Sequence, residues 1–252
     1  METNKSLFNY CLRLADDSLI LGHRLSEMCS RGPMIEEDLA LTNIALDHIG
    51  RAQAILKYAG EIEGKKRTED EIAYRREERE YQNHLITEQP NGDFAHVIAR
   101  QLYISLFEAL LYAELEKSKD ATLASIASKT LKEVRYHLTH STDWVVRLGD
   151  GTEESHTRMQ NAMNALWMYT DELFEMDDLD ALMVKSGIGV DLALLKPKWE
   201  SLLKETLQEA TLEMPIASYM HTGSRVGIHS ENLGHILCEM QYLQRTYPDA
   251  KW

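Results

Sequence analysis

Apolar residues recur every three or four positions along most of this chain, which is the spacing of amphipathic α-helices. The first such segment covers about residues 7–28 and stops at Arg31-Gly32-Pro33. The same spacing predicts further helices over about residues 34–58, 93–117, 121–148, 152–174, 192–212 and 230–245. Asp93, Thr152 and Lys196 are expected to mark helix starts. The segment 93–117 is apolar nearly all round, so we expect it in the core.

Few residues interrupt this pattern. The 252 residues include only 13 Gly and 5 Pro, and no Gly/Pro/Ser-rich linker divides them. Long helices joined by short connections pack as antiparallel bundles. We therefore predict an all-α fold, an antiparallel helical bundle with additional C-terminal helices, in a single domain covering residues 1–252.

The charge and composition of the chain argue against some classes of binding partner. The formal net charge is -14, which argues against nucleic acid or an anionic membrane as the main partner. No apolar run approaches about 18 residues, so no membrane span is predicted. Cys11, Cys29 and Cys238 have neither zinc-site nor disulfide spacing, which fits a reducing, cytoplasmic compartment. The first residues show no leader pattern.

A helical bundle can hold a di-iron centre, and that centre has a recognisable pattern. It needs a Glu from each of two helices and a Glu-x-x-His from each of two others, because residues i and i+3 share a helix face. Only His156 has a Glu three residues earlier, Glu153, and only His96 has an Asp, Asp93. Both pairs lie at predicted helix starts, where capping and surface charge explain them. The sequence therefore has no paired Glu-x-x-His set in mid-helix.

Other polar and aromatic groups are interpreted as structural. Three sets could be ligand pairs but are more often ordinary side-chain pairs: Glu133–His137–His140, Asp47–His48 and His23–Glu27. Asp16-Asp17 is interpreted as an exposed carboxylate pair, and the charged segment 65–80 as a solvated helical connector. Trp144, Trp167 and Tyr169 are expected to pack in the core. Phosphate-loop and Gly-x-Ser-x-Gly motifs are absent.

Several runs of sequence are more specific than the helical pattern. They are EDLAL (37–41), NIALD (43–47), EQPNGDFA (88–95), KEVRYHL (132–138), RLGDGT (147–152), GIHSENLG (227–234) and EMQYLQR (239–245). Together they resemble the non-catalytic, PaaC-type subunit family of bacterial ring 1,2-phenylacetyl-CoA epoxidases. The similarity covers essentially the whole chain.

The resemblance implies a ferritin-like fold and a place in a multicomponent complex. In that family the di-iron centre lies in a homologous catalytic subunit, a small subunit bridges the two, and a reductase brings electrons from NADPH. The complex epoxidises the ring of phenylacetyl-CoA with O2. The implied partners are thus the catalytic subunit, the small bridging subunit and the reductase. We expect the isolated chain to form a homodimer through an apolar face on its second and third helices.

The resemblance also implies which positions to compare with a catalytic relative. Such a relative has Glu-x-x-His on its second and fourth helices, where this chain reads Asp47-x-x-Gly50 and Val134-x-x-His137. On the third helix Glu108 is the nearest carboxylate, but the resemblance aligns Ser105 there. We therefore predict no catalytic, cofactor-binding or metal residue and no cofactor in this chain. Asp47 and His137 are expected to pair with each other or with a basic side chain.

The prediction is a structural subunit of the oxygenase, and two alternatives stay open. In one, the chain is itself a metal-dependent oxygenase with an unusual ligand set: Glu27, Asp47, Glu108, Glu133 and His137. In the other, it is a helical adaptor unrelated to oxygen chemistry.

Overall fold

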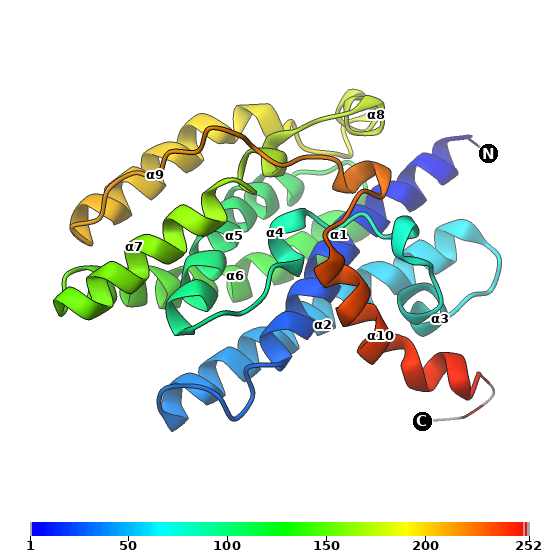
Figure 1. Cartoon of the computed structure of the whole chain (residues 1–252). Helices are drawn as coiled ribbons and strands as arrows, with labels where there is room; N and C mark the ends of the chain where they lie inside the picture. Colours follow the sequence, from blue (N-terminus) through cyan, green and yellow to red (C-terminus); the bar gives the residue numbers. More distant parts are fainter. Residues whose placement is uncertain (1, 249, 251–252) are drawn as a thin grey trace. The chain divides into compact units, whose positions relative to one another are not determined.

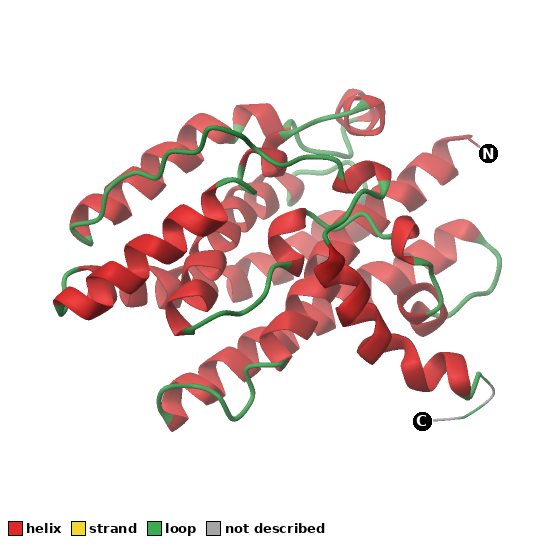
Figure 2. Cartoon of the chain, in the orientation of Figure 1, coloured by secondary structure: helices red, strands yellow, loops and turns green. Residues whose placement is uncertain are grey.

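A computed structural model describes residues 2–248 and 250 (Figure 1). Among these residues it has helices and loops and no strand (Figure 2). The α-helices are α1 (Glu2–Ser26), α2 (Ile35–Glu63), α3 (Glu69–Tyr74), α4 (Leu85–Glu88), α5 (Phe94–Leu115), α6 (Ala121–Gly149), α7 (Glu153–Trp167), α8 (Asp178–Ser186), α9 (Lys196–Glu209) and α10 (Glu231–Thr246). The predicted all-α class is confirmed, and the helices are consistent with a ferritin-like bundle that has additional C-terminal helices.

The capping residues and the proline in the sequence predict the starts of three helices correctly. Asp93 caps α5 by accepting a hydrogen bond from the His96 N–H at 3.1 Å, and Thr152 caps α7 through the Ser155 N–H. Helix α9 starts at Lys196 with proline in its first turn, as predicted. The predicted helix 152–174 is shorter than expected. It ends at Trp167, and a 3-10 turn over Asp171–Phe174 follows.

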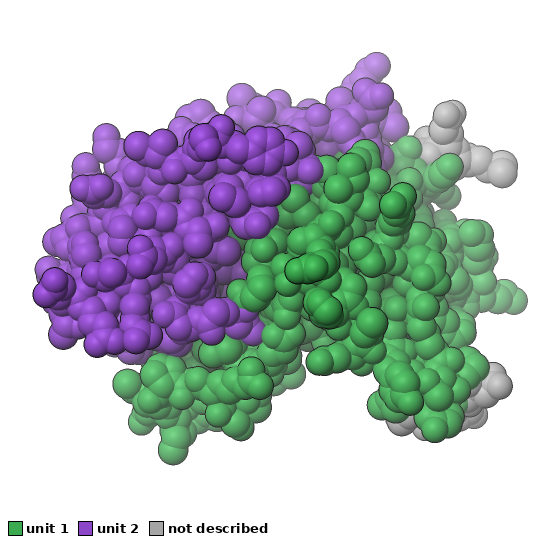
Figure 3. All heavy atoms as spheres, viewed as in Figure 1, with its two compact units in different colours: residues 1–90, 223–252 green, residues 91–222 purple. Residues whose placement is uncertain are grey.

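The chain divides into two compact units (Figure 3). Unit 1 comprises residues 1–90 and 223–252, and unit 2 comprises residues 91–222. The interpretation of residues 1–252 as one domain stays a prediction.

Unit 1 is built on the hairpin of α1 and α2, whose facing sides are apolar. Leu21, Leu25 and Ile44 are fully buried there. The short helix α4 packs on α1, and the C-terminal helix α10 packs on α1, α3 and α4. Segments more than 130 residues apart in the sequence therefore meet in this unit.

Unit 2 is built on α5, which packs on α6, α7 and α9. The Trp199 indole N–H donates to the Tyr103 carbonyl at 3.0 Å, and the Tyr103 hydroxyl donates to the Met163 carbonyl at 3.0 Å. Trp167 stacks on Trp199, but Trp144, Trp167 and Tyr169 are only half-buried, so the prediction that these three rings pack in the core is wrong in part. Helix α5 is long and apolar enough to cross a membrane, although none had been predicted, but 83% of its apolar window is buried. That burial is what a core helix of a helical bundle shows.

Candidate functional site

A carboxylate and an imidazole lie together inside unit 2. Glu108 on α5 is 4% exposed, His137 on α6 is fully buried, and their potential ligand atoms lie within 4.8 Å of each other. Ser105, which the resemblance aligned at the carboxylate position, instead receives a hydrogen bond from the Gln101 amide at 3.0 Å. The carboxylate that lies beside His137 within unit 2 is Glu108.

The inward face of α2 differs from the one that the resemblance suggested. His48 and Ala45 are buried, whereas Asp47 is only partly buried and Gly50 is exposed. A Cβ atom added at Gly50 would meet nothing within 4 Å. Asp47-x-x-Gly50 is thus wrong as the inward pair, because one position along a helix rotates a side chain by about 100°. The inward pair is Ala45 and His48, and the pairing of Asp47 with His137 stays a prediction.

These positions allow a test of whether the chain fits a di-iron centre. Helix α2 has Ala45 three residues before His48, and α6 has Val134 three residues before His137. All four side chains are buried. A di-iron bundle needs a glutamate at each of the two earlier positions, and neither alanine nor valine has a donor atom. The residues present therefore do not fit this metal centre.

Two other members of the unusual ligand set, Glu27 and Glu133, face cations on their own helices. Glu27 accepts a hydrogen bond from the Arg24 guanidinium at 2.8 Å. The Glu133 carboxylate lies 3.5 Å from the ammonium of Lys129, one turn away on α6. Within unit 2 the set is thus brought together only at Glu108 and His137.

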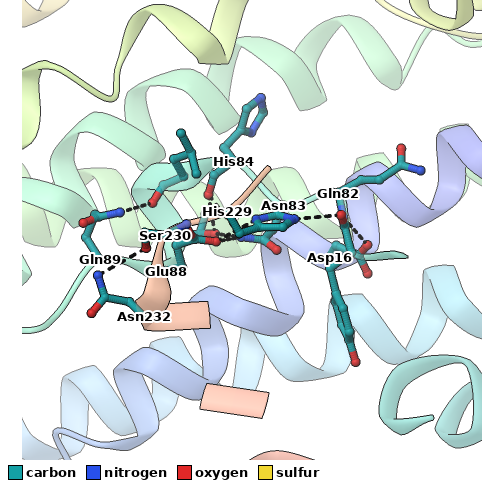
Figure 4. A network of polar contacts seen from close by, with 12 residues as sticks. Asp16, Gln82, Asn83, His84, Glu88, Gln89, His229, Ser230 and Asn232 are labelled. Carbon is teal, nitrogen blue, oxygen red and sulfur yellow. Dashed lines mark hydrogen bonds and ion pairs between the residues drawn. The ribbon is translucent and has the colours of Figure 1, made fainter. Parts of the chain in front are cut away.

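Unit 1 holds a second buried Glu–His pair, which sequence reasoning missed. The carboxylate of Glu88 at the end of α4 accepts hydrogen bonds from the Ser230 N–H at 2.6 Å and the Asn83 side-chain amide at 2.9 Å. It also lies 2.9 Å from Nδ1 of His229. Nε2 of His229 lies 2.9 Å from the Tyr81 carbonyl oxygen. Figure 4 shows these residues, which join α4 to the segment that precedes α10.

Helix α1 also contacts the two chain segments that carry Glu88 and His229. The Arg24 guanidinium donates to the Glu88 carbonyl at 3.0 and 2.9 Å and reaches the Asn232 carbonyl at 3.4 Å. One arginine thus contacts both chain segments that the Glu88–His229 pair joins.

The acidic pair on α1 is not exposed as its sequence suggested, because Asp16 is buried and Asp17 is half-buried. Asp16 is fully buried and accepts two hydrogen bonds from the Arg76 guanidinium, one of them at 2.8 Å. Arg76 also lies 4.2 Å above the Tyr81 ring. The interpretation of residues 65–80 as a solvated connector is therefore wrong in part, since Arg76 folds back onto α1 to compensate a buried charge.

The second carboxylate of that pair, Asp17, contacts His84 and Arg225. It accepts a hydrogen bond from the His84 backbone N–H at 2.6 Å and lies 3.0 Å from His84 Nδ1. The Arg225 guanidinium lies 3.3 Å from the carboxylate. Burial alone would raise the pKa of Asp17, but the charges of His84 and Arg225, with the hydrogen bonds from His84, lower it to about 2.

Helix α10 is attached through its own polar side chains. The Gln241 amide donates to the Arg76 carbonyl at 2.9 Å and to the Tyr81 hydroxyl at 2.8 Å. The Arg245 guanidinium donates to the same carbonyl at 3.0 Å. We call residues 223–246 the C-terminal clasp, because buried polar contacts attach this segment to residues 76–88 and to α1.

One signal in the sequence could have located this cluster. Glu88, His229 and Gln241 lie in the specific runs EQPNGDFA, GIHSENLG and EMQYLQR. The runs that carry the resemblance thus include the attachment points of the C-terminal clasp. By contrast, His96 and His156, which the metal search singled out, lie at helix starts beside Asp93 and the Gly149 carbonyl, as predicted.

The outer side of α2 carries apolar residues. Ile35, Leu39 and Leu46 are 76%, 58% and 63% exposed. They recur at helical spacing, so they lie on one face of α2. Helix α5 is buried along most of its length, and so the second helix, rather than the third, displays the apolar face.

Two comparisons with known proteins identify the family of this chain. The whole chain, residues 1–252, matches the family model described as phenylacetic acid catabolic protein. The chain belongs to this family. It is also 46% identical over 243 residues to a protein of Escherichia coli (strain K12) that is named as a subunit of 1,2-phenylacetyl-CoA epoxidase, a match that covers 96% of this chain and 98% of that protein. The resemblance found in the sequence is thereby confirmed.

Proposed function

We propose that this chain is a structural, non-catalytic subunit of a multicomponent di-iron oxygenase that epoxidises the aromatic ring of phenylacetyl-CoA. One observation carries the proposal. The buried positions that precede His48 and His137 by one helical turn are Ala45 and Val134, which cannot bind a metal. The similarity to a 1,2-phenylacetyl-CoA epoxidase subunit supports the choice of complex.

The proposed partners follow from this role. The di-iron centre belongs to a homologous catalytic subunit, a small subunit bridges the two chains, and an NADPH-linked reductase supplies electrons in the cytoplasm. The exposed apolar residues Ile35, Leu39 and Leu46 on α2 supply the docking face. Apolar faces of this kind are typical of permanent complexes. In the isolated chain the same face forms a homodimer.

Co-expression with the catalytic subunit of a phenylacetyl-CoA epoxidase tests the proposal. We expect a stable complex that contains iron and epoxidises the ring, and no such activity from this chain alone. Leu39→Asp with Leu46→Asp should abolish co-purification, because two charges would be buried in the interface. Leu194→Asp is the matched control, since Leu194 is 75% exposed but lies in unit 2. Ring epoxidation by the chain alone would contradict the proposal.

A second candidate is metal binding by this chain itself. Glu108 and His137 favour it, since their potential ligand atoms lie within 4.8 Å of each other. Glu108→Ala with His137→Ala, studied in the purified complex, separates the two functions. A structural subunit leaves the iron content and the turnover per iron of the complex unchanged, whereas a metal-binding subunit loses iron.

A further inference from the structure

The two ring nitrogens of His229 both face hydrogen-bond acceptors. Nε2 lies 2.9 Å from the Tyr81 carbonyl oxygen, which can only accept. Nδ1 lies 2.9 Å from Oε2 of Glu88. A neutral imidazole has only one N–H, so it can satisfy only one of these acceptors. If Glu88 is ionised, His229 must carry a proton on each nitrogen.

The contacts of Glu88 indicate the ionised form. Oε1 accepts the backbone N–H of Ser230 at 2.6 Å, and Oε2 accepts the side-chain amide of Asn83 at 2.9 Å. Both oxygens thus already receive hydrogen bonds from N–H groups, which favours the charged carboxylate. The side chains of Glu88 and His229 are each 0% exposed, so water does not compensate either charge.

Neighbouring charged groups in unit 1 are paired among themselves. Arg24 on α1 pairs with Glu27, Arg76 pairs with Asp16, and Arg225 lies beside Asp17 and His84. Each of these carboxylates has a cation of its own. His229 lies directly against the Glu88 carboxylate, where an imidazolium balances its charge.

We propose that a buried imidazolium–carboxylate pair, His229 with Glu88, holds the C-terminal clasp, so that docking of the clasp takes up a proton. The docked state binds the His229 proton more tightly than the released state, in which an ordinary histidine loses it near pH 6.5. The stabilising contribution is therefore fully present below about pH 6.5 and is lost as pH rises through the titration of the docked pair. Mildly alkaline pH releases the clasp.

The test is the protonation state of His229 in the full-length chain. Nitrogen NMR with 15N-labelled histidine distinguishes a ring with two N–H groups from either neutral tautomer, and His229→Gln assigns the signal. At pH 7.5 an ordinary histidine keeps its second proton in about one molecule in ten. We expect His229 to keep both protons at this pH, and to become neutral in Glu88→Gln, which preserves the side-chain shape. A neutral His229 in the unmodified chain at pH 7.5 would overturn the proposal.

Hydrogen exchange of residues 223–246 measures the release directly. After correction for the intrinsic exchange rate, the opening equilibrium should rise by up to about tenfold per pH unit between about pH 6.5, where a released histidine loses its proton, and the pH at which the docked His229 titrates. His235→Gln is the matched control, because His235 is a histidine on α10 outside the Glu88–His229 pair, and it should leave the slope unchanged. An opening equilibrium that stays constant over this pH range, or that keeps its slope in Glu88→Gln, would overturn the inference.

Discussion

The two units each bury a glutamate beside a histidine, and the surroundings give the pairs different roles. Glu108 and His137 of unit 2 come from adjacent helices of one hairpin, with Val134 one turn before the histidine. Glu88 and His229 of unit 1 come from segments 141 residues apart, and backbone and side-chain N–H groups surround the carboxylate. A buried Glu–His pair therefore does not identify a metal site by itself. The residue one turn before the histidine and the donors around the carboxylate decide its role.

Removing the Glu88 carboxylate should have the largest effect on the free energy of unfolding. Glu88→Ala leaves a buried histidine charge and two buried N–H donors without their acceptor, so we expect a loss of about 3–5 kcal/mol in the free energy of unfolding. Urea denaturation, followed by circular dichroism, measures it. Glu231→Ala, an exposed glutamate nearby on α10, should change stability by less than about 0.5 kcal/mol. Equal effects of the two substitutions would show that Glu88 does not hold the clasp.

Asp17 should make unit 1 sensitive to acid. Its pKa is lowered from 3.8 to about 2, so its contribution is present above pH 3.8 and is lost as pH falls from there towards 2. The shift corresponds to about 2 kcal/mol. Asp17→Asn should therefore be less stable at neutral pH and should lose less stability between pH 4 and 2. Unfolding curves of both proteins across this range check the difference, and parallel acid profiles would contradict it.

Replacing Glu108 should have a smaller effect on the free energy of unfolding. Glu108→Gln keeps the shape and most hydrogen-bonding capacity of the side chain, so the free energy of unfolding should fall by about 1 kcal/mol. The iron content of the complex with the catalytic subunit should stay the same. A fall in iron that exceeds the loss of folded protein would show that this pair does bind metal.

The smallest effect on folding is expected on the outer face of α2. Leu46→Asp should change the stability of the isolated chain by no more than about 0.5 kcal/mol, because Leu46 is 63% exposed. The same substitution should weaken self-association in analytical ultracentrifugation. Unchanged association at equal concentration would remove this face from the proposed interface.

The helices could be predicted from the sequence because their signals are local. Apolar spacing, the caps Asp93 and Thr152, and Pro197 in the first turn of α9 all act within a few residues. The polar clusters could not be predicted in the same way. Asp16 is buried because Arg76 lies opposite, 60 residues away, and neither residue predicts the other.

The choice of the inward residue on α2 shows the same limit at a finer scale. Choosing Asp47 instead of His48 as the inward residue of α2 is an error of one position. That single step turns a side chain from the core towards solvent, and the apolar pattern alone left the choice open. The absence of glutamate before each mid-helix histidine, in contrast, was already evident in the sequence, and it is the observation on which the proposed function depends.

Iron analysis of the isolated chain, expressed with ample iron and without a partner, tests this account most directly. The account predicts no stoichiometric iron, because Ala45 and Val134 replace the glutamates that a di-iron centre requires. About two iron atoms per chain would contradict it and would make this chain a metal-dependent oxygenase subunit in its own right.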